Sequence, residues 1–255
     1  MKIVITGTGG FIGGHLKTAL EKDGHVVVPY DRKQGKDIRD FDMDINVDMV
    51  IHLAADADVR RSIQYPDEYW ENNVKPTTKI QRLCHAMNVP LLYASSSCIH
   101  NWSLSPYGTS KKVNEETAFP GQVGLRFTTV YGEGARESML IGKLVRGDIK
   151  YLTRHTRDFI HVDDVVKAIQ FIMTKVRSPH LFPGIPLEAA YDIGTGKGVV
   201  VEEIGLLAGW EGIEVRDGDP CEAQNNTADN SKLRELGWEP TIDIEDYIVR
   251  KTIPH

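Results

Sequence analysis

The chain has 255 residues and a formal net charge of −6, with 41% hydrophobic and 26% charged side chains. These fractions are ordinary for a globular protein, and the acidic balance excludes the basic surface of a nucleic-acid-binding protein. Three scattered cysteines are too few for a disulfide framework or a zinc site. No apolar stretch approaches the roughly 20 residues that span a bilayer. We therefore expect a cytoplasmic protein with no metal, nucleic-acid or membrane partner.

Five apolar runs in the first half of the chain predict strands, and amphipathic segments between them predict helices. The apolar residues of each run are continuous rather than alternating, as in strands buried on both faces of a parallel sheet. This alternation of strand and helix predicts an α/β fold with a doubly wound parallel sheet of the Rossmann type. The predicted strands are 2–6, 25–30, 49–53, 90–95 and 122–127, and the predicted helices are 11–23, 67–87 and 107–118.

The pattern changes after Tyr131, and the final third is richer in Asp, Glu and Gly. We interpret this part as a small α/β substrate lobe. Residues 1–132, joined by 157–195, are expected to form the larger, Rossmann-type domain, and residues 133–156 and 196–255 the lobe. The elements predicted here are helices over 138–145, 162–176, 201–207 and 231–236 and a strand over 149–152.

A glycine-rich segment, Thr6–Gly13, follows the first predicted strand and opens the first predicted helix. Gly7 permits a tight turn, Gly10 has no Cβ to block a pyrophosphate, and Gly13 lets the helix pack close to the sheet. The start of that helix offers free N–H groups and a partial positive charge to an anion. This strand–loop–helix context predicts a dinucleotide site. Its predicted cofactor contacts are Gly7, Gly9, Gly10, Phe11, Ile12 and Gly13.

Asp31 ends the second predicted strand, where a carboxylate can accept hydrogen bonds from both hydroxyls of the adenosine ribose. That position favours NAD as the cofactor. The neighbouring Arg32 and Lys33 could instead meet a 2′-phosphate, which leaves NADP as the alternative. Tighter binding of NADP than of NAD in a titration would overturn the preference.

Tyr107 and Lys111 lie four residues apart at the start of a predicted helix and therefore on one helix face. The lysine charge, with the positive nicotinamide, is expected to lower the pKa of the tyrosine from about 10 toward neutrality. Tyr107 would then serve as general base for a sugar hydroxyl. Three serines, 95–97, end a strand at the edge where open α/β sheets bind ligands, so one can hydrogen-bond that hydroxyl or merely cap backbone groups.

With these residues assembled, the chain resembles the extended short-chain dehydrogenase/reductase family, and within it the NAD-dependent nucleotide-sugar epimerases and dehydratases. The resemblance covers nearly the whole chain. Its most specific segment is Arg-Asp-Phe-Ile-His-Val-Asp-Asp at 157–164, and His-Leu-Ala-Ala at 52–55 and Leu-Gly-Trp-Glu-Pro at 236–240 also match. The resemblance implies NAD as cofactor, a nucleotide sugar as substrate, and a homodimer formed through the predicted helices 67–87 and 107–118.

The resemblance also implies roles for individual residues. Ser96, Tyr107 and Lys111 match the catalytic triad; Ser96 is chosen because the family serine lies four positions before a tyrosine whose place His100 takes here. Only eleven positions separate Ser96 from Tyr107, fewer than in most members, so a loop over the substrate is missing. Further implied cofactor contacts are Arg32, Asp37, Ile38, Leu53, Ala54, Ala55 and Asn73, together with Tyr107 and Lys111. Arg216 is expected at the substrate diphosphate and Asp219 at its ribose.

Two further features concern the sugar. The stretch 125–132, with Arg136 after it, is similar to that of the uronate 4-epimerases. The small hydroxyl side chains of Ser97 and Thr129, with Arg136 nearby, could hold a sugar carboxylate, although Thr129 could simply end a strand. Cys98 falls where 3,5-epimerases and GDP-fucose synthases place an acid/base cysteine. The His or Lys partner of that cysteine is missing, so Cys98 is expected to be a small buried residue.

The expected function is therefore an NAD-dependent nucleotide-sugar 4-epimerase that acts on a UDP-sugar, with UDP-glucuronate or UDP-galacturonate as candidates. Tyr107 would remove the C4 hydroxyl proton, and the 4-keto sugar would take the hydride back on its other face. A dehydratase or an NAD(P)-dependent 4-keto reductase is the alternative, although Ser97 and Cys98 replace the acidic pair that a dehydratase needs. A scaffold that binds NAD without turnover is a non-enzymatic alternative, against which the Tyr107/Lys111 pair argues.

Overall fold

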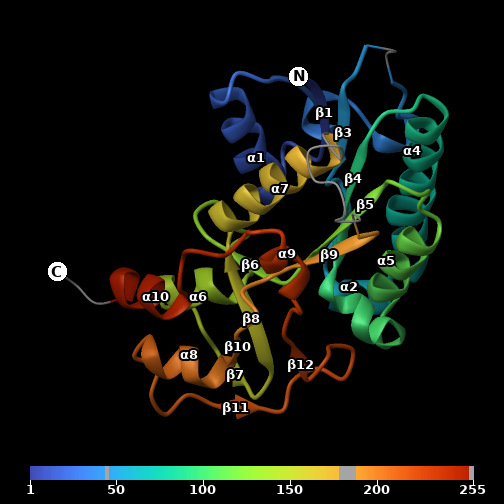
Figure 1. The fold of residues 1–255 in the computed structure, drawn as a ribbon. Helices are drawn as coiled ribbons and strands as arrows, with labels where there is room; N and C mark the ends of the chain where they lie inside the picture. Colours follow the sequence, from blue (N-terminus) through green and yellow to red (C-terminus); the bar gives the residue numbers. More distant parts are fainter. Residues whose placement is uncertain (44–45, 178–187, 253–255) are drawn as a thin grey trace.

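A six-stranded sheet forms the centre of the larger part of the molecule (Figure 1). In this computed structural model, which describes residues 1–43, 46–177 and 188–252, the strand order is β2-β1-β3-β4-β5-β9. All neighbouring strands are parallel, which confirms the predicted doubly wound fold. The five expected strands are present, and β9 was not predicted. The bounds are β1 Lys2–Thr6, β2 Val26–Tyr30, β3 Met49–His52, β4 Leu91–Ser96, β5 Val123–Phe127 and β9 Ala190–Ile193.

Helices cover both faces of this sheet (Figure 1). On one face α1 (Phe11–Lys22) packs beside α7 (Val162–Arg177), and on the other lie α4 (Lys75–Ala86) and α5 (Pro106–Glu116). The predicted helices at 11–23, 107–118 and 162–176 are therefore confirmed, with ends shifted by one or two residues. Because both faces of the sheet are covered, its strands can be apolar on both sides.

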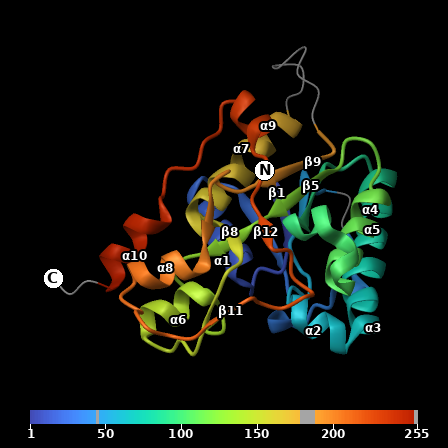
Figure 2. The same cartoon turned by 90° about the horizontal axis from the view of Figure 1, so that it is seen from below.

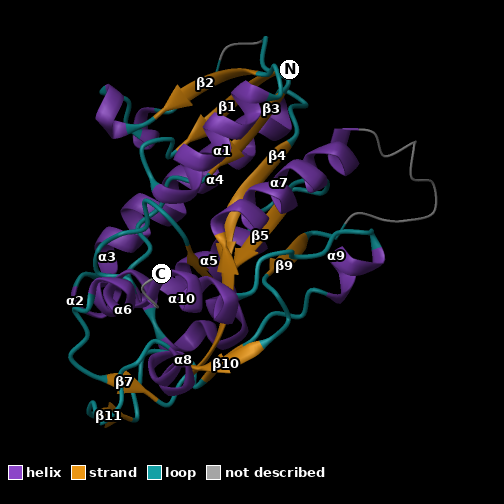
Figure 3. Cartoon of the chain, turned by 90° about the vertical axis from the view of Figure 1, so that its left-hand side faces the viewer, coloured by secondary structure: helices purple, strands orange, loops and turns teal. Residues whose placement is uncertain are grey.

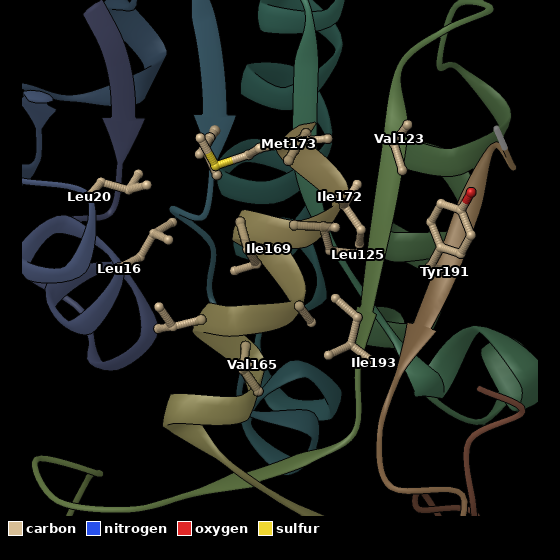
Figure 4. Packing of buried hydrophobic residues seen from close by; sticks show 14 of the residues in the cluster. Leu16, Leu20, Val123, Leu125, Val165, Ile169, Ile172, Met173, Tyr191 and Ile193 are labelled. Carbon is tan, nitrogen blue, oxygen red and sulfur yellow. The ribbon is translucent and has the colours of Figure 1, made fainter. Parts of the chain in front are cut away.

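The core between α7 and the sheet is made of aliphatic side chains (Figure 4). Ile169 and Ile172 of α7 pack in one cluster with Leu125 of β5 and Ile193 of β9, and all four are fully buried. Leu16 of α1 belongs to the same cluster. Full burial of such a side chain contributes about 1.5–3 kcal/mol, so this packing firmly fixes the start of α1 against the end of β1.

The helix expected over 67–87 is present as a continuous helical run from Pro66 to Ala86, but it contains a π-helical turn that was not predicted: α3 (Pro66–Tyr69), the turn (Trp70–Val74) and α4 follow one another without a break. Pro76 lies in the first turn of α4, directly after this π-helical turn. A π-helical turn widens the backbone ladder and often marks a functional site, and this one carries Asn73. Dimerisation through this segment and α5 stays a prediction.

A short helix, α2 (Val59–Gln64), precedes this segment and was not predicted. Its N-terminus is capped by the Asp58 carboxylate, which accepts a hydrogen bond from the Arg61 backbone N–H at 2.9 Å. This cap places α2 directly after the loop that leaves β3.

The remaining elements form a smaller lobe at one end of the sheet (Figures 1 and 3). Its own core contains Leu144, Leu152, Phe159, Ile204 and Ile248. The strand expected over 149–152 is wrong apart from its last residue, because pairing with β11 begins only at Leu152. The lobe helices are α6 Leu140–Arg146, α8 Val201–Leu207, α9 Ser231–Glu235 and α10 Ile244–Thr252, and its strands are β6 Thr129–Tyr131, β7 Leu152–Thr153, β8 Thr156–His161, β10 Gly198–Val200, β11 Val215–Arg216 and β12 Asn225–Asn226.

The three helices predicted in the lobe are present, whereas α10 and most of the short strands were not predicted. Two residues expected in the lobe, Leu233 and Trp238, pack in the main core instead. The division into two domains at the stated boundaries stays a prediction. Across the described residues, no helix is both long and apolar enough to cross a membrane.

Candidate active site

A cavity of about 1490 Å³ lies at the carboxyl ends of the central strands. Its lining includes the loop after β1, the loop after β3 and the ends of β4 and β5. The chain passes from β1 to β2 on one side and to β3 on the other, and open α/β sheets bind ligands at such a switch point. The volume exceeds the roughly 300–1,000 Å³ of a typical single-ligand pocket, which leaves room for a cofactor and a substrate together.

The glycine loop shapes one end of this cavity. Gly7 has a φ of +77°, and a Cβ there would come within 2.7 Å of the Ala54 nitrogen. A Cβ at Gly13 would lie 2.1 Å from the Gly7 carbonyl oxygen. Because Gly7 directly follows β1, this close approach agrees with the expected packing of the helix start against the sheet, and Gly7 in turn lies close to the residues that follow β3. At Gly10 the nearest contact would be 3.2 Å, so its outer side faces the cavity.

The start of α1 is suited to an anion. Gly10 is the N-cap, and no side chain caps this helix end. Backbone N–H groups of the first turn therefore face the cavity, which Phe11 and Ile12 also line. A side-chain-free cradle beside a helix start is what a dinucleotide pyrophosphate needs, so these residues fit NAD.

Asp31 lies beside this loop and binds it directly. Its carboxylate accepts hydrogen bonds from the Gly9 and Lys33 backbone N–H groups, each at 2.8 Å. The Lys33 ammonium in turn donates to the Gly9 carbonyl at 2.7 Å. An adjoining cavity of about 270 Å³, lined by Asp31, Arg32 and Ile38 among others, has a size that suits an adenosine end.

Two other predicted cofactor residues are engaged with the protein instead. Asp37 pairs with Arg39, whose hydrogen bonds hold the pKa of that carboxyl well below its usual range. Arg32 lies 3.4 Å from Asp37 and donates to the Asn72 side chain at 3.3 Å. Asp37 does not line either of the two cavities, whereas Arg32 lines the smaller one.

The three serines that end β4 have separate partners. Ser95 donates to Glu115 at 2.5 Å, and Ser97 donates to the Phe127 carbonyl at 3.1 Å. Ser96 accepts a hydrogen bond from the Cys98 backbone N–H at 3.2 Å and lines the cavity. Because Ser95 and Ser97 hold the ends of neighbouring elements, this geometry favours Ser96 as the serine that serves a substrate.

Tyr107 and Lys111 meet in the same cavity, both almost fully buried. The Lys111 Nζ lies 5.8 Å from the centre of the Tyr107 ring and donates to the Ala94 carbonyl at 2.9 Å. Burial lowers the pKa of Lys111 to about 8. Burial also raises the pKa of Tyr107 well above its ordinary value, and hydrogen bonding with Ser96 opposes this only in part. In the chain alone, desolvation by burial is the largest effect on this pKa. The expected lowering depends on a bound nicotinamide together with Lys111 and stays a prediction.

Asn73 supports these residues from behind and does not line the cavity itself. Its side chain accepts from the Asp56 N–H at 2.8 Å and donates to the Asp56 carbonyl at 2.9 Å. It also donates to the Ser110 hydroxyl at 3.2 Å, between Tyr107 and Lys111 on α5. Asn73 thus ties the loop after β3 to α5, which carries Tyr107 and Lys111, and in this structure it makes protein contacts where a cofactor contact was predicted. Leu53 and Ala55 of that loop line the main cavity, and Ala54 lines the smaller one.

Cys98 is half-buried and lines the cavity beside Ser96, rather than being fully buried as expected. Burial raises the pKa of its thiol, which disfavours the thiolate. Hydrogen bonding with Ser96 and the charges of Arg157 and Lys111 lower this pKa but do not outweigh burial.

The predicted substrate residues divide into two groups. Ser97, Thr129 and Arg136 line the main cavity, and within the described residues no carboxylate forms an ion pair with Arg136. Arg216 lies outside that cavity, because its guanidinium is held by Glu214 at 2.7–2.8 Å and stacks on the Tyr151 ring. Asp219 is not among the lining residues either, and it accepts from the Cys221 N–H at 3.1 Å.

Three charged residues that line the lobe side of the cavity were not identified as site residues from the sequence: Arg60, Arg157 and Glu222. Arg157 belongs to the matched 157–164 motif and Arg60 lies five residues after the matched 52–55 motif, but no spacing rule indicated that either side chain faces the cavity. Glu222 lies in a turn of the lobe and carried no signal in the sequence.

Comparisons with known proteins agree with this geometry. Residues 3–183 match the model of the NAD dependent epimerase/dehydratase family. Protein CapI of Staphylococcus aureus is 29% identical over 321 aligned residues, covering 96% of each chain. UDP-glucuronate 4-epimerase 1 of Arabidopsis thaliana is 27% identical over 231 residues, covering 66% of this chain and 54% of the relative.

A solved structure is similar over the same extent. MoeE5 in complex with UDP-glucuronic acid and NAD has a TM-score of 0.81 and 27% sequence identity, covering 98% of this chain and 97% of MoeE5. The alignment with CapI is longer than the 255 residues of this chain, so CapI contains segments that have no counterpart here. The family match covers well over half of the chain and confirms the predicted family and its NAD cofactor: this chain belongs to the NAD dependent epimerase/dehydratase family.

Proposed function

We propose that this chain is a UDP-sugar 4-epimerase. The observation that carries the proposal is that Ser96, Tyr107 and Lys111 come together in one cavity with the glycine loop. The relatives support it, since one is a UDP-glucuronate 4-epimerase and another was solved with UDP-glucuronic acid and NAD. A UDP-sugar in the large cavity would place its hexose near Tyr107 and its nucleotide toward the lobe.

Proton transfer at the sugar C4 oxygen is the task of Tyr107. Bound NAD would supply the hydride acceptor and donor, and its positive nicotinamide would offset part of the burial that raises the Tyr107 pKa. Ser96 is placed to hydrogen-bond the same oxygen, and Lys111 adds positive charge behind the phenol ring at 5.8 Å. After oxidation, the 4-keto sugar turns its other face to the hydride, and Tyr107 returns the proton.

A uronate is the substrate class that the lobe side favours. Thr129 and Arg136 both line the cavity, and in the described part of the chain Arg136 has no ion-pair partner. An arginine without a protein carboxylate can bind one from the substrate, in a charge-assisted hydrogen bond. We therefore propose UDP-glucuronate and UDP-galacturonate as the substrate pair.

The test is turnover of a panel of UDP-sugars by the purified, NAD-loaded protein. Interconversion of UDP-glucuronate and UDP-galacturonate, with deuterium at C4 retained in the product, is expected. Arg136→Met should raise the KM for the uronate roughly 10- to 100-fold with less effect on UDP-glucose, since hydrogen bonds to charged groups contribute about 1.5–3 kcal/mol. Arg154→Met is the matched control, because Arg154 pairs with Asp217 outside the cavity.

Two results would point to the alternative chemistry. Release of a 4-keto product that has lost water would indicate a dehydratase, and consumption of NADPH followed at 340 nm would indicate a 4-keto reductase. Retained binding of NAD and UDP-sugars with no turnover on the whole panel would contradict the proposed reaction altogether.

A further inference from the structure

A cluster of charged and polar side chains joins α2 to the lobe across the cavity. Arg60 of α2 donates from Nε to a Glu222 carboxylate oxygen at 2.8 Å and from Nη1 to the Tyr151 hydroxyl at 3.3 Å. The carboxylate of Asp219 lies 3.7 Å from the same Nε. In Figure 2, α2 lies beside the segment that leads from β11 to β12, which carries Asp219 and Glu222.

Glu222 connects this cluster to a second arginine. Its other carboxylate oxygen accepts a hydrogen bond from Arg157 Nη2 of β8 at 2.9 Å. Each oxygen of the carboxylate thus binds one arginine, and all three side chains line the cavity. Charge-assisted hydrogen bonds of this kind fix the orientation of each guanidinium group as well as its distance from the carboxylate.

The two arginines differ in how they are held. The Arg157 side chain is only 12% exposed, and its Nη1 donates to the Thr156 and Ala223 carbonyls at 3.0 and 2.8 Å. The Arg60 side chain is 46% exposed, and the contacts described above all come from the lobe. Loss of the Arg60 side chain would therefore leave Arg157 bonded to the Thr156 and Ala223 carbonyls but remove these contacts between α2 and the lobe.

Elsewhere the lobe is held by buried backbone contacts on the side of α7. The Asp158 carboxylate accepts from the Thr195 and Gly196 N–H groups, each at 2.8 Å. The Asp164 carboxylate accepts from the Thr241 and Ile242 N–H groups at 2.7 and 2.8 Å. The lobe is thus anchored along one side, and the Arg60 cluster lies on the cavity side.

From this arrangement we infer that Arg60 is a positioning residue for the substrate. Acting through Glu222, it holds the lobe segment 219–224 and the guanidinium of Arg157 at a fixed distance from Tyr107. An anionic substrate that spans the cavity must contact both sides, so its binding depends on that distance. This inference rests on the proposed function only for the identity of the substrate, since the bridge itself is a property of the chain.

The experiment compares Arg60→Met with Arg61→Met, its neighbour on α2. Arg61 is a matched control, because it pairs with Glu68, stacks on the Tyr65 ring and does not line the cavity. In Arg60→Met the KM for the UDP-sugar should rise by about tenfold while kcat and NAD affinity stay within about twofold, because a half-exposed charged contact is lost. Arg61→Met should leave all three unchanged.

A double-mutant cycle with Glu222→Gln tests whether Arg60 acts through Glu222. The single variants should each raise KM, and the double variant should be little worse than either one. Multiplicative effects would show that Arg60 contacts the substrate independently and would overturn the inference. A fall in KM for Glu222→Gln would also overturn it, because Glu222 would then compete with the substrate for the arginines.

Hydrogen exchange without any sugar nucleotide separates this inference from the proposed function. In the NAD-loaded protein, Arg60→Met should exchange faster than Arg61→Met in segments 149–153 and 219–226. Equal exchange would overturn the bridge even if the enzyme epimerises UDP-sugars. Faster exchange in a protein that turns over no UDP-sugar would uphold the bridge and reject the proposed reaction.

Discussion

On the cofactor side of the cavity the backbone makes the surface, whereas on the lobe side charged side chains from distant segments make it. A Cβ at Gly7 or Gly13 would clash with neighbouring backbone atoms, and Gly10 presents no side chain to the cavity. The strand behind this loop is buried, with Ile3–Ile5 only 0–5% exposed. Across the cavity, Arg60, Arg157 and Glu222 come from a helix, a strand and a turn far apart in the chain. The shape of the first surface therefore depends on local backbone geometry, and that of the second on ionic contacts between distant segments.

The largest expected effect comes from Tyr107, which lies between the two surfaces. Tyr107→Phe removes the only proton that this ring can exchange with the sugar, so kcat should fall by about 10²–10⁴-fold. Tyr69→Phe is the control, because its ring lies 6.2 Å from that of Tyr107 but its hydroxyl donates to the Asp58 carbonyl. Turnover assays should show Tyr69→Phe within about tenfold of the parent. Activity of Tyr107→Phe within tenfold of the parent would contradict the assigned role.

The sequence predicted the cofactor side of the cavity better than the lobe side. The glycine loop, Asp31 and the Tyr107/Lys111 pair depend on contacts within one strand–loop–helix unit or one helix turn, so spacing was enough to identify them. The central strands could also be predicted from the sequence, because strands buried on both faces consist of continuous apolar runs. β9 was missed because its neighbour in the sheet, β5, is more than sixty residues away in sequence.

The lobe could not be predicted in this way. Its strands are two to six residues long, too short for a periodic pattern, and its cavity-facing charges depend on how segments 60, 157 and 222 meet. Arg216 shows the limit most clearly, because the resemblance pointed to it while Glu214, two residues away, binds its guanidinium. The burial of Tyr107, which raises its pKa in the chain alone, likewise cannot be read from the spacing of Tyr and Lys.

A second prediction tests whether the cofactor surface is set by backbone shape. In Gly13→Ala the new methyl group would meet the Gly7 oxygen at 2.1 Å, so the loop must shift. We expect a loss of about 1–3 kcal/mol in the free energy of unfolding and loss of bound NAD after purification. Gly14→Ala is the matched control, because its Cβ would meet Thr8 at an ordinary 3.6 Å. Equal NAD retention in the two variants would show that loop shape does not set cofactor binding.

A third prediction concerns the anchor of the lobe on α7. Burial raises the pKa of Asp164, but hydrogen bonds from Thr241 and Ile242 outweigh it, so the pKa lies below the ordinary value. The ionised Asp164 carboxylate therefore stabilises the fold above the pKa of about 3.9 that it has in the unfolded chain. This stability is lost as the pH falls through its lower pKa in the folded state. Asp164→Asn should lower the free energy of unfolding by about 1–3 kcal/mol at pH 7. It should also lose less stability than the parent between about pH 5 and 3.

The control for this anchor is Asp163→Asn, the adjacent residue, whose side chain is 57% exposed. Urea unfolding at each pH measures both variants. If Asp163→Asn is as destabilising as Asp164→Asn, the buried hydrogen bonds are not what anchors the lobe.

The smallest expected effect belongs to His100, which lies in the short connection between Ser96 and Tyr107. A hydrogen bond to Asp192, at 2.9 Å, raises its pKa against the opposing effect of burial. A raised folded pKa gives stability that is fully present below the unfolded value of about 6.5 and is lost as the pH rises through the folded value. Because the His100 side chain is 46% exposed, solvent screening limits the gain to about 0.2–1 kcal/mol.

His100→Gln should therefore flatten the decline in stability between about pH 6 and 8.5, measured by urea unfolding at fixed ionic strength. Over this range the free energy of unfolding of the parent should fall by about 0.2–1 kcal/mol from this pair, and that of the variant should not. An unchanged slope would mean that Asp192 is satisfied by Arg126, 3.6 Å away, and that His100 adds nothing. The shortened connection would then be held to the sheet without a contribution from the His100 charge, unlike the lobe side, where Arg60 and Glu222 form an ion pair.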